Sequence, residues 1–205
     1  MKKLLTFILL FVVSLSAHSA VESSLVKSAS TYLNSITGLT GKFTQIANGK
    51  TDSGTFDMLR PGRVRLDYKK SPIQLISDGT DLYFIDSGLD QITTIPLTST
   101  PAGILIRKKI DLSGADIVVS ETEKNKNTFS LKMHIKGNQG MGNMRVVFNS
   151  NPVSLNSWVV TDATGTQTDV KFSGLKTKTD FGKNYFQIKK HKTITNDAFG
   201  DDYYE

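Results

Sequence analysis

Apolar residues recur at every second position in several stretches of the chain, and this period of two restricts its fold more than any other feature. Such alternation is typical of strands with one face buried and the other in water. Within residues 63–68, for example, Val64, Leu66 and Tyr68 alternate with charged residues. The other apolar positions in such stretches are Phe43, Leu82, Phe84, Phe129, Leu131, Met133, Ile135, Val146, Phe148, Val170 and Phe172.

Short turn-forming sequences separate these stretches at fairly regular distances, which predicts an antiparallel sheet. They are Asp78-Gly79, Ser87-Gly88, residues 124–127, Asn151-Pro152 and Thr164-Gly165. A large sheet with one apolar face has to cover that face, and it can do so by curling around short helices.

One predicted helix lies near the start of the chain. In residues 22–36 the apolar side chains follow the three- and four-residue spacings of an amphipathic helix that ends near Gly38. These side chains are Leu25, Ala29, Tyr32, Leu33 and Ile36.

A second helix is predicted for residues 100–109. Ser99 or Thr100 can cap its start, and Pro101 suits its first turn. Ile104 and Leu105 give it an apolar edge.

The first nineteen residues are predicted to be a secretory signal peptide. Lys2 and Lys3 precede an apolar run over residues 4–15, and the small-residue pattern of residues 17–19 follows. The run is shorter than the ~20 residues of a membrane span, so we expect cleavage before Ala20 rather than a retained anchor. Residues 20–205 then form one domain, because no linker, repeat or low-complexity tract divides them.

The composition argues against several classes of function. The chain has no cysteine, so we expect neither a disulfide nor a lipid anchor at the end of the signal peptide. Its net charge of +6 comes from scattered bases, which indicates a solvated surface rather than a nucleic-acid site. We find no metal, nucleotide or catalytic motif, so we expect neither a cofactor nor an enzyme.

Several motifs agree in order and spacing with one known family. They are Gly54–Gly62 with its Arg60-Pro61 pair, Arg63–Tyr68, Ser77–Asp86, Leu89–Thr93, Pro96-Leu97 and Thr100–Ile106. Together they resemble the LolA family, the periplasmic carriers of outer-membrane lipoproteins, and the likeness covers nearly all of the chain after the signal peptide.

The resemblance implies a fold and a function. The fold is mainly β with some α: an incomplete, half-open antiparallel β-barrel of about eleven strands, covered by the N-terminal helix and a short lid helix. The implied function is that of a monomeric periplasmic chaperone. It would accept acylated lipoproteins from an inner-membrane ABC transporter, shield their acyl chains in an apolar cavity and deliver them to an outer-membrane acceptor.

Ten apolar residues are our candidates for the cavity wall or the lid, although the same residues can form an ordinary filled core. They are Phe43, Phe56, Val64, Leu66, Tyr68, Leu82, Phe84, Ile104, Leu105 and Trp158. The family often has aromatic residues where this chain has Val64 and Leu66, which predicts a cavity of different shape.

Arg60 is the polar candidate. By itself it reads as an exposed arginine at the end of a strand, kept extended by Pro61. The resemblance implies instead that Arg60 hydrogen-bonds to the lid and controls its opening, a role that suits the five donors of a guanidinium group.

Two other functions stay open at this stage. The same half-barrel can carry or sense another lipid, such as a phospholipid or glycolipid, because a fold does not fix its ligand. The chain can also be a non-lipid interaction module that uses its acidic and aromatic tail, residues 198–205.

Overall fold

The computed structural model describes the backbone of residues 9–188 and the side chains of residues 22–188. The tail at residues 198–205 and the first eight residues of the predicted signal peptide lie outside this part. Among the described residues, no helix is both long enough and apolar enough to cross a bilayer.

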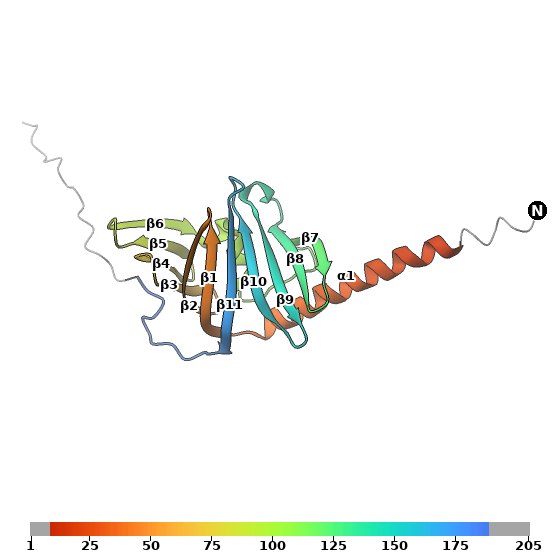
Figure 1. Ribbon diagram of the computed structural model, residues 1–205, viewed down its shortest axis with the longest axis horizontal. Helices are drawn as coiled ribbons and strands as arrows, with labels where there is room; N and C mark the ends of the chain where they lie inside the picture. Colours follow the sequence, from red (N-terminus) through yellow and green to blue (C-terminus); the bar gives the residue numbers. More distant parts are fainter. Residues whose placement is uncertain (1–8, 189–205) are drawn as a thin grey trace, which may run out of the picture.

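Eleven antiparallel strands form a single sheet that curls without closing (Figure 1). In chain order they are β1 Gly38–Ala47, β2 Lys50–Leu59, β3 Arg63–Tyr68, β4 Ile73–Asp78, β5 Asp81–Asp86, β6 Gln91–Pro96, β7 Ile117–Lys124, β8 Thr128–Ile135, β9 Asn143–Ser150, β10 Val153–Thr161 and β11 Gln167–Thr177. Their spatial order is β6-β5-β4-β3-β2-β1-β11-β10-β9-β8-β7.

The first and last strands meet in the middle of this sheet. Phe43 of β1 lies opposite Phe172 of β11, and this pairing joins two meanders, β1–β6 and β7–β11. Strands β6 and β7 remain as the two edges of the sheet. The half-open antiparallel barrel expected from the sequence is therefore confirmed.

Helix α1, Leu9–Ser35, is the long helix of the chain, and its N-terminal half projects past the sheet in Figure 1. The predicted helix began at Glu22, so the start was wrong: among the described residues the helix already begins at Leu9. The predicted end before Gly38 is confirmed, and Leu25, Ala29 and Leu33 are buried as their spacing indicated.

The connection between β6 and β7 crosses the concave side as short 3₁₀ turns. These turns are η1 Leu97–Ser99 and η2 Pro101–Ile106. Another 3₁₀ turn, η3 Gln139–Met141, lies in the connection between β8 and β9. The Thr100 hydroxyl caps η2 by accepting from the backbone N–H of Ala102, as expected from the sequence. The predicted extension to Lys109 was wrong, because the backbone is already extended at Arg107.

The core lies between the concave face and its cover of α1 and η2. Phe56, Trp158 and Phe172 form an aromatic cluster, with ring centroids 4.5 to 5.9 Å apart. Segment η2 reaches across to β8, β9 and β10, which all belong to the β7–β11 meander.

Candidate functional site

A cavity of about 410 Å³ lies between the concave face of the sheet and the η1–η2 segment. We call this cavity the chamber and the η1–η2 segment the lid. The chamber wall is mainly aliphatic and aromatic, and strands from both halves of the sheet contribute to it. A concave space lined in this way is suited to an apolar ligand.

Seven of the ten candidate residues line the chamber. They are Phe56, Val64, Leu66, Tyr68, Leu82, Leu105 and Trp158. Leu105 belongs to the lid, and the other six lie on the concave face of their strands. Alternation in the sequence identified Val64, Leu66, Tyr68 and Leu82.

The other three candidates lie nearby but do not line the chamber. Phe43 is buried with its ring edge-on to Tyr68, at a centroid distance of 4.9 Å. Ile104 is fully buried in the core, so Leu105 rather than Ile104 is the lid residue that faces the space. Phe84 lines an adjoining cavity at the end of the concave face.

Arg60 is buried, with 8% of its surface exposed, at the end of strand β2. Its Nε and Nη2 donate to the Leu105 carbonyl at 3.0 and 2.7 Å, and its Nη1 donates to the Leu33 carbonyl. Leu33 lies in the last turn of α1, where backbone carbonyls lack partners within the helix. One guanidinium group therefore ties the helix to the lid.

The electrostatics of Arg60 are unusual for a buried cation. Among the described residues no carboxylate pairs with it, and its partners are carbonyl groups. Burial lowers the pKa of Arg60 to about 10, which leaves the group charged at neutral pH. The C-terminal end of a helix carries partial negative charge, and this compensates in part for the missing carboxylate.

The turn after Arg60 forms a second contact with the lid. The Gly62 N–H donates to the Ile106 carbonyl at 2.6 Å, and the fully buried Ser77 hydroxyl donates to the Gly62 carbonyl at 2.7 Å. Gly62 has φ +75°, and a Cβ there would lie 2.6 Å from Gly79. Both the conformation and the close approach require glycine.

Asn34 provides a third tie. Its side-chain amide donates to the Ile110 carbonyl at 2.8 Å, and the Ile110 N–H donates to its carbonyl oxygen at 2.9 Å. The chain just after the lid is therefore bound to the last turn of α1. Polar contacts thus hold the C-terminal end of the lid segment over an apolar space.

Comparison with known proteins decides the family. The family model of the outer membrane lipoprotein carrier protein LolA matches residues 34–189. The chain belongs to the LolA family. Its relatives include the outer-membrane lipoprotein carrier protein of Legionella pneumophila strain Corby, which is 30% identical over 203 residues, covering 93% of this chain and 96% of that protein.

A second relative agrees with this membership, and a solved structure shares the fold. The outer-membrane lipoprotein carrier protein of Neisseria meningitidis serogroup B is 28% identical over 187 residues, 87% of this chain and 89% of that protein. The crystal structure of a DUF1329 family protein from Desulfovibrio piger superimposes with a TM-score of 0.50 at 10% identity, over 79% of this chain and 94% of that chain. The latter likeness concerns the fold alone.

The strands and the lid contribute further chamber residues that were not among the candidates for this LolA-family chain. Gln45, Met58, Leu75, Ile95, Val160 and Val170 come from the strands, and Leu97 comes from the lid. Met58 lies two residues after Phe56 on the same strand, and Val170 was among the alternating apolar positions. The sequence pattern therefore indicated that both side chains face the concave side. Leu97 belongs to the lid, where no period identifies the inward side.

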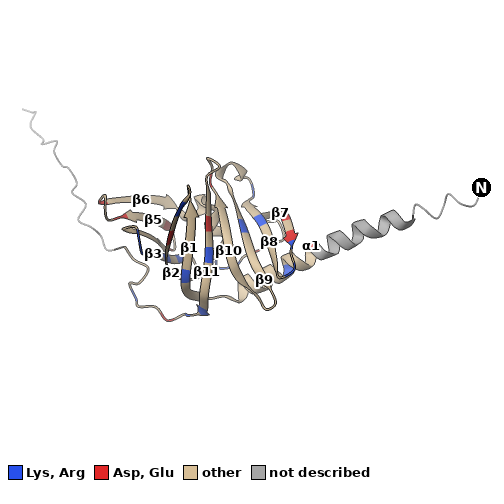
Figure 2. Ribbon diagram, viewed as in Figure 1, with Lys and Arg blue, Asp and Glu red and all other residues tan. Residues whose placement is uncertain are grey.

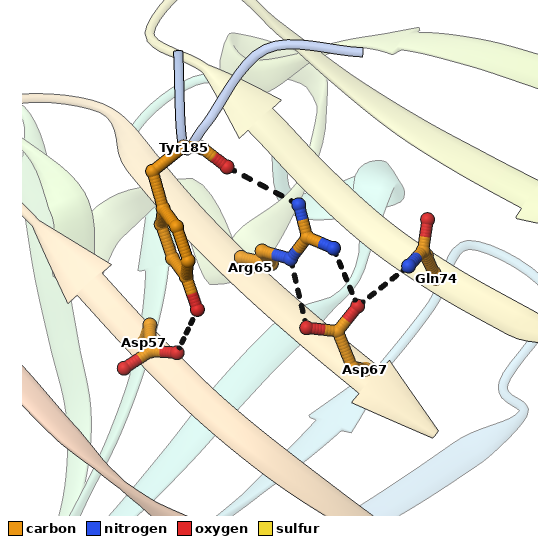
Figure 3. A network of polar contacts seen from close by, with 5 residues as sticks. All are labelled: Asp57, Arg65, Asp67, Gln74 and Tyr185. Carbon is orange, nitrogen blue, oxygen red and sulfur yellow. Dashed lines mark hydrogen bonds and ion pairs between the residues drawn. The ribbon is translucent and has the colours of Figure 1, made fainter. Parts of the chain in front are cut away.

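The outer, convex face carries a polar network that sequence reasoning missed (Figure 3). The Tyr185 hydroxyl donates to Asp57 Oδ2 at 2.6 Å, and Arg65 donates to the Tyr185 carbonyl at 3.2 Å. Arg65 also forms a two-bond ion pair with Asp67, at 2.7 and 3.0 Å, and Gln74 donates to the same carboxylate. The hydrogen bond from Arg65 to Asp67 raises the pKa of Arg65.

These contacts hold residues 178–188, which we call the strap, against strands β2 and β3. Phe181, Tyr185 and Phe186 pack on one another with ring centroids 5.1 to 5.3 Å apart. The guanidinium groups of Arg63 and Arg65 lie 6.0 and 5.2 Å from the ring centroids of Phe186 and Tyr185. The aromatic spacing in this segment has neither a strand nor a helix period, which is why no pattern predicted it.

Lysine, arginine and acidic residues are spread over several strands in the view of Figure 2. On the convex side of β7–β9, Arg145 pairs with Glu121 at 2.7 Å and with Glu123 at 3.6 Å. In the part of the chain that the structure describes, no group of three histidine or acidic side chains could hold a metal ion.

Proposed function

We propose that this LolA-family chain is a periplasmic carrier that shields the acyl chains of lipoproteins in its chamber. In this proposal it accepts acylated lipoproteins from an inner-membrane ABC transporter, crosses the periplasm as a soluble one-to-one complex, and hands its cargo to the outer membrane. The observation that carries the proposal is an apolar chamber under a lid that is tied down mainly by Arg60.

The need for shielding follows from the cost of exposing acyl chains to water. Burial of a methylene group is worth about 0.8 kcal/mol, so a triacylated lipoprotein with about 45 methylenes faces a barrier of tens of kcal/mol to leaving a membrane alone. A carrier lowers this barrier only if it covers most of that surface. An apolar wall does so without requiring specific polar groups on the cargo.

The chamber has to enlarge to accept such cargo. Its volume of about 410 Å³ is in the range of cavities that hold one drug-sized ligand. Three acyl chains are larger than that, so we infer that the lid moves outward on loading. The acyl chains then replace Leu105 and the other lid residues against the concave face.

Arg60 gives this movement two defined states. In the closed state Arg60 donates hydrogen bonds to the Leu33 and Leu105 carbonyls. In the open state of our proposal these carbonyls contact water or cargo instead. Because the closed state recovers those hydrogen bonds when cargo leaves, Arg60 favours release. The sequence has no nucleotide-binding motif, so in our proposal the energy for loading comes from the transporter and no chemical step takes place on this chain.

The test is to incubate the mature protein with membranes that carry lipoproteins and an active transporter, and to identify what copurifies by mass spectrometry. A soluble one-to-one complex with triacylated lipoprotein is the expected result. Recovery of phospholipid or glycolipid alone would replace this proposal with a carrier of another lipid. Recovery of no lipid would favour an interaction module.

A further inference from the structure

A second cavity adjoins the chamber on the concave face. Its volume is about 500 Å³, and it shares Gln45 and Tyr68 with the chamber. We call it the vestibule. The rest of its wall comes from the β1–β2 hairpin, the β3–β4 connection and β5, namely Ala47, Lys50, Thr51, Asp52, Lys70, Ser71, Ile73 and Phe84.

Strand register places the vestibule and the chamber along one trough. Gln45 and Ala47 follow the buried Phe43 at two-residue steps on β1, so they share its inward face. Asp52 of β2 lies opposite Gln45. Phe84 of β5 lies opposite Leu75, which lines the chamber. The two cavities are therefore neighbours on the concave face, with Gln45 and Tyr68 in the wall of both.

The two cavities differ in chemistry. Lys50 and Lys70 are exposed at the vestibule, and among the described residues neither is paired with a carboxylate. The carboxylate in the vestibule wall, Asp52, already accepts from the Ser53, Lys70 and Ser71 N–H groups and from the Ser71 hydroxyl, at 2.6 to 3.2 Å. It fixes the β3–β4 connection. Lys70 Nζ donates to the Thr51 carbonyl at 3.4 Å, and an ammonium group has three donors, so Lys70 as well as Lys50 keeps donors for a ligand.

Tyr68 and Gln45 mark the boundary between the two cavities. The Tyr68 hydroxyl donates to Gln45 Oε1 at 2.6 Å, and burial raises the pKa of this phenol to about 12. On one side of this pair the wall is apolar, and on the other it carries two cations and a serine. An amphiphile that lies across the boundary meets apolar groups with its chains and donors with its polar end.

We propose that the vestibule binds the polar end of the acylated ligand whose chains occupy the chamber. The Lys50 and Lys70 ammonium groups donate to the ester and amide carbonyl oxygens where the acyl chains join the peptide. This inference rests on the proposed carrier function. It adds a site that fixes the orientation of the cargo, with the peptide leaving the protein past the β1–β2 hairpin.

The experiment measures binding of a fluorescent triacylated lipopeptide to the mature protein. We expect the Lys50→Gln/Lys70→Gln variant to bind about tenfold more weakly than the wild type. A matched variant, Lys42→Gln/Lys171→Gln, removes two exposed lysines from the convex side of β1 and β11 and is expected to stay within about twofold. A long-chain alcohol without carbonyl groups should bind all three proteins equally.

A photoreactive group on the first peptide residue of the lipopeptide gives the position directly. We expect it to label residues 47–52 or 69–73 in the wild type. Equal binding by both lysine variants, with labelling elsewhere, would overturn the vestibule while leaving the carrier function intact. Failure of the wild type to bind the lipopeptide at all would overturn the carrier function, and the vestibule with it.

Discussion

Two covers lie on opposite faces of the same strands, and they are held in different ways. The lid covers the concave face, and its charged tie, Arg60, bonds only to carbonyl groups. The strap covers the convex face, and its charged tie, Arg65, is locked in an ion pair with Asp67 and donates to Tyr185 as well.

The difference indicates which cover moves. Removing the hydrogen-bond donor of a buried carboxylate is expensive, since the carboxylate stays desolvated. When the lid lifts, water can solvate both the guanidinium group of Arg60 and the carbonyls that it leaves. Lifting the strap takes the Tyr185 hydroxyl from the buried Asp57 carboxylate, whose Oδ1 already lacks a partner. We therefore expect the lid to open while the strap stays in place.

The largest effect is expected from Arg60→Leu. This change leaves the Leu33 and Leu105 carbonyls without their donors, which destabilises the closed lid by about 1–3 kcal/mol. The variant should fold and take up lipoprotein, yet retain it about 10- to 100-fold more tightly against an acceptor. Transfer from the purified loaded protein to acceptor membranes measures this.

Arg63→Leu is the matched control for Arg60→Leu, because Arg63 packs over Phe186 on the strap side and does not touch the lid. It should transfer cargo normally. Equal transfer by the wild type and both variants would remove the lid role of Arg60.

A covalent lock on the lid is expected to have the next largest effect. Asn34→Cys/Ile110→Cys replaces the reciprocal hydrogen bonds between α1 and the end of the lid segment with two thiols, in a chain that has no others. The oxidised form should take up less than about a tenth of the lipopeptide that the reduced form takes up. Equal uptake by both forms would show that this end of the lid does not move.

Loss of the strap tie should affect stability rather than transfer. Tyr185→Phe removes the donor to Asp57 and is expected to lower the free energy of unfolding by about 1–3 kcal/mol, measured by urea denaturation. Tyr83→Phe, which removes an exposed bond to Asp78, should change it by less than about 0.5 kcal/mol. A transfer defect in Tyr185→Phe as large as that of Arg60→Leu would contradict the claim that the lid moves while the strap stays in place.

The smallest effect concerns alkaline pH. Burial raises the pKa of Tyr68 and of Tyr185 to about 12, and the bond to Asp57 adds to the shift of Tyr185. Since a free phenol titrates near pH 10, each group contributes stability that is complete below about pH 10 and lost as the pH rises towards 12. Tyr68→Phe and Tyr185→Phe should each remove one late step from the ultraviolet titration of tyrosine. Titration of both groups near pH 10 would contradict the burial described here.

The sheet could be predicted because its signal is local. A strand buried on one face has to alternate, so Val64, Leu66 and Tyr68 identified their strand and its inward side without further information. Four of the candidates that line the chamber, Val64, Leu66, Tyr68 and Leu82, followed from this rule.

The lid and the strap were harder to predict because they depend on long-range contacts. Arg60 alone reads as an exposed arginine, and the residues that bury it, Leu33 and Leu105, are 27 and 45 positions away. Ile104 and Leu105 are adjacent, and nothing in a short turn shows which of them faces the chamber. The hydrogen bond between Tyr185 and Asp57 joins residues 128 positions apart, and no periodic pattern in the sequence indicates it.

Hydrogen exchange with and without bound triacylated lipopeptide tests the two-cover account most directly. Two amides that bond to the lid or just after it report on its position: Gly62, bonded to Ile106, and Ile110, bonded to Asn34. Lys178 and Tyr185 report on the strap. The account predicts faster exchange at the two lid amides when lipopeptide is bound, with the strap amides unchanged. Unchanged lid amides in the loaded protein, or faster exchange at the strap instead, would contradict it.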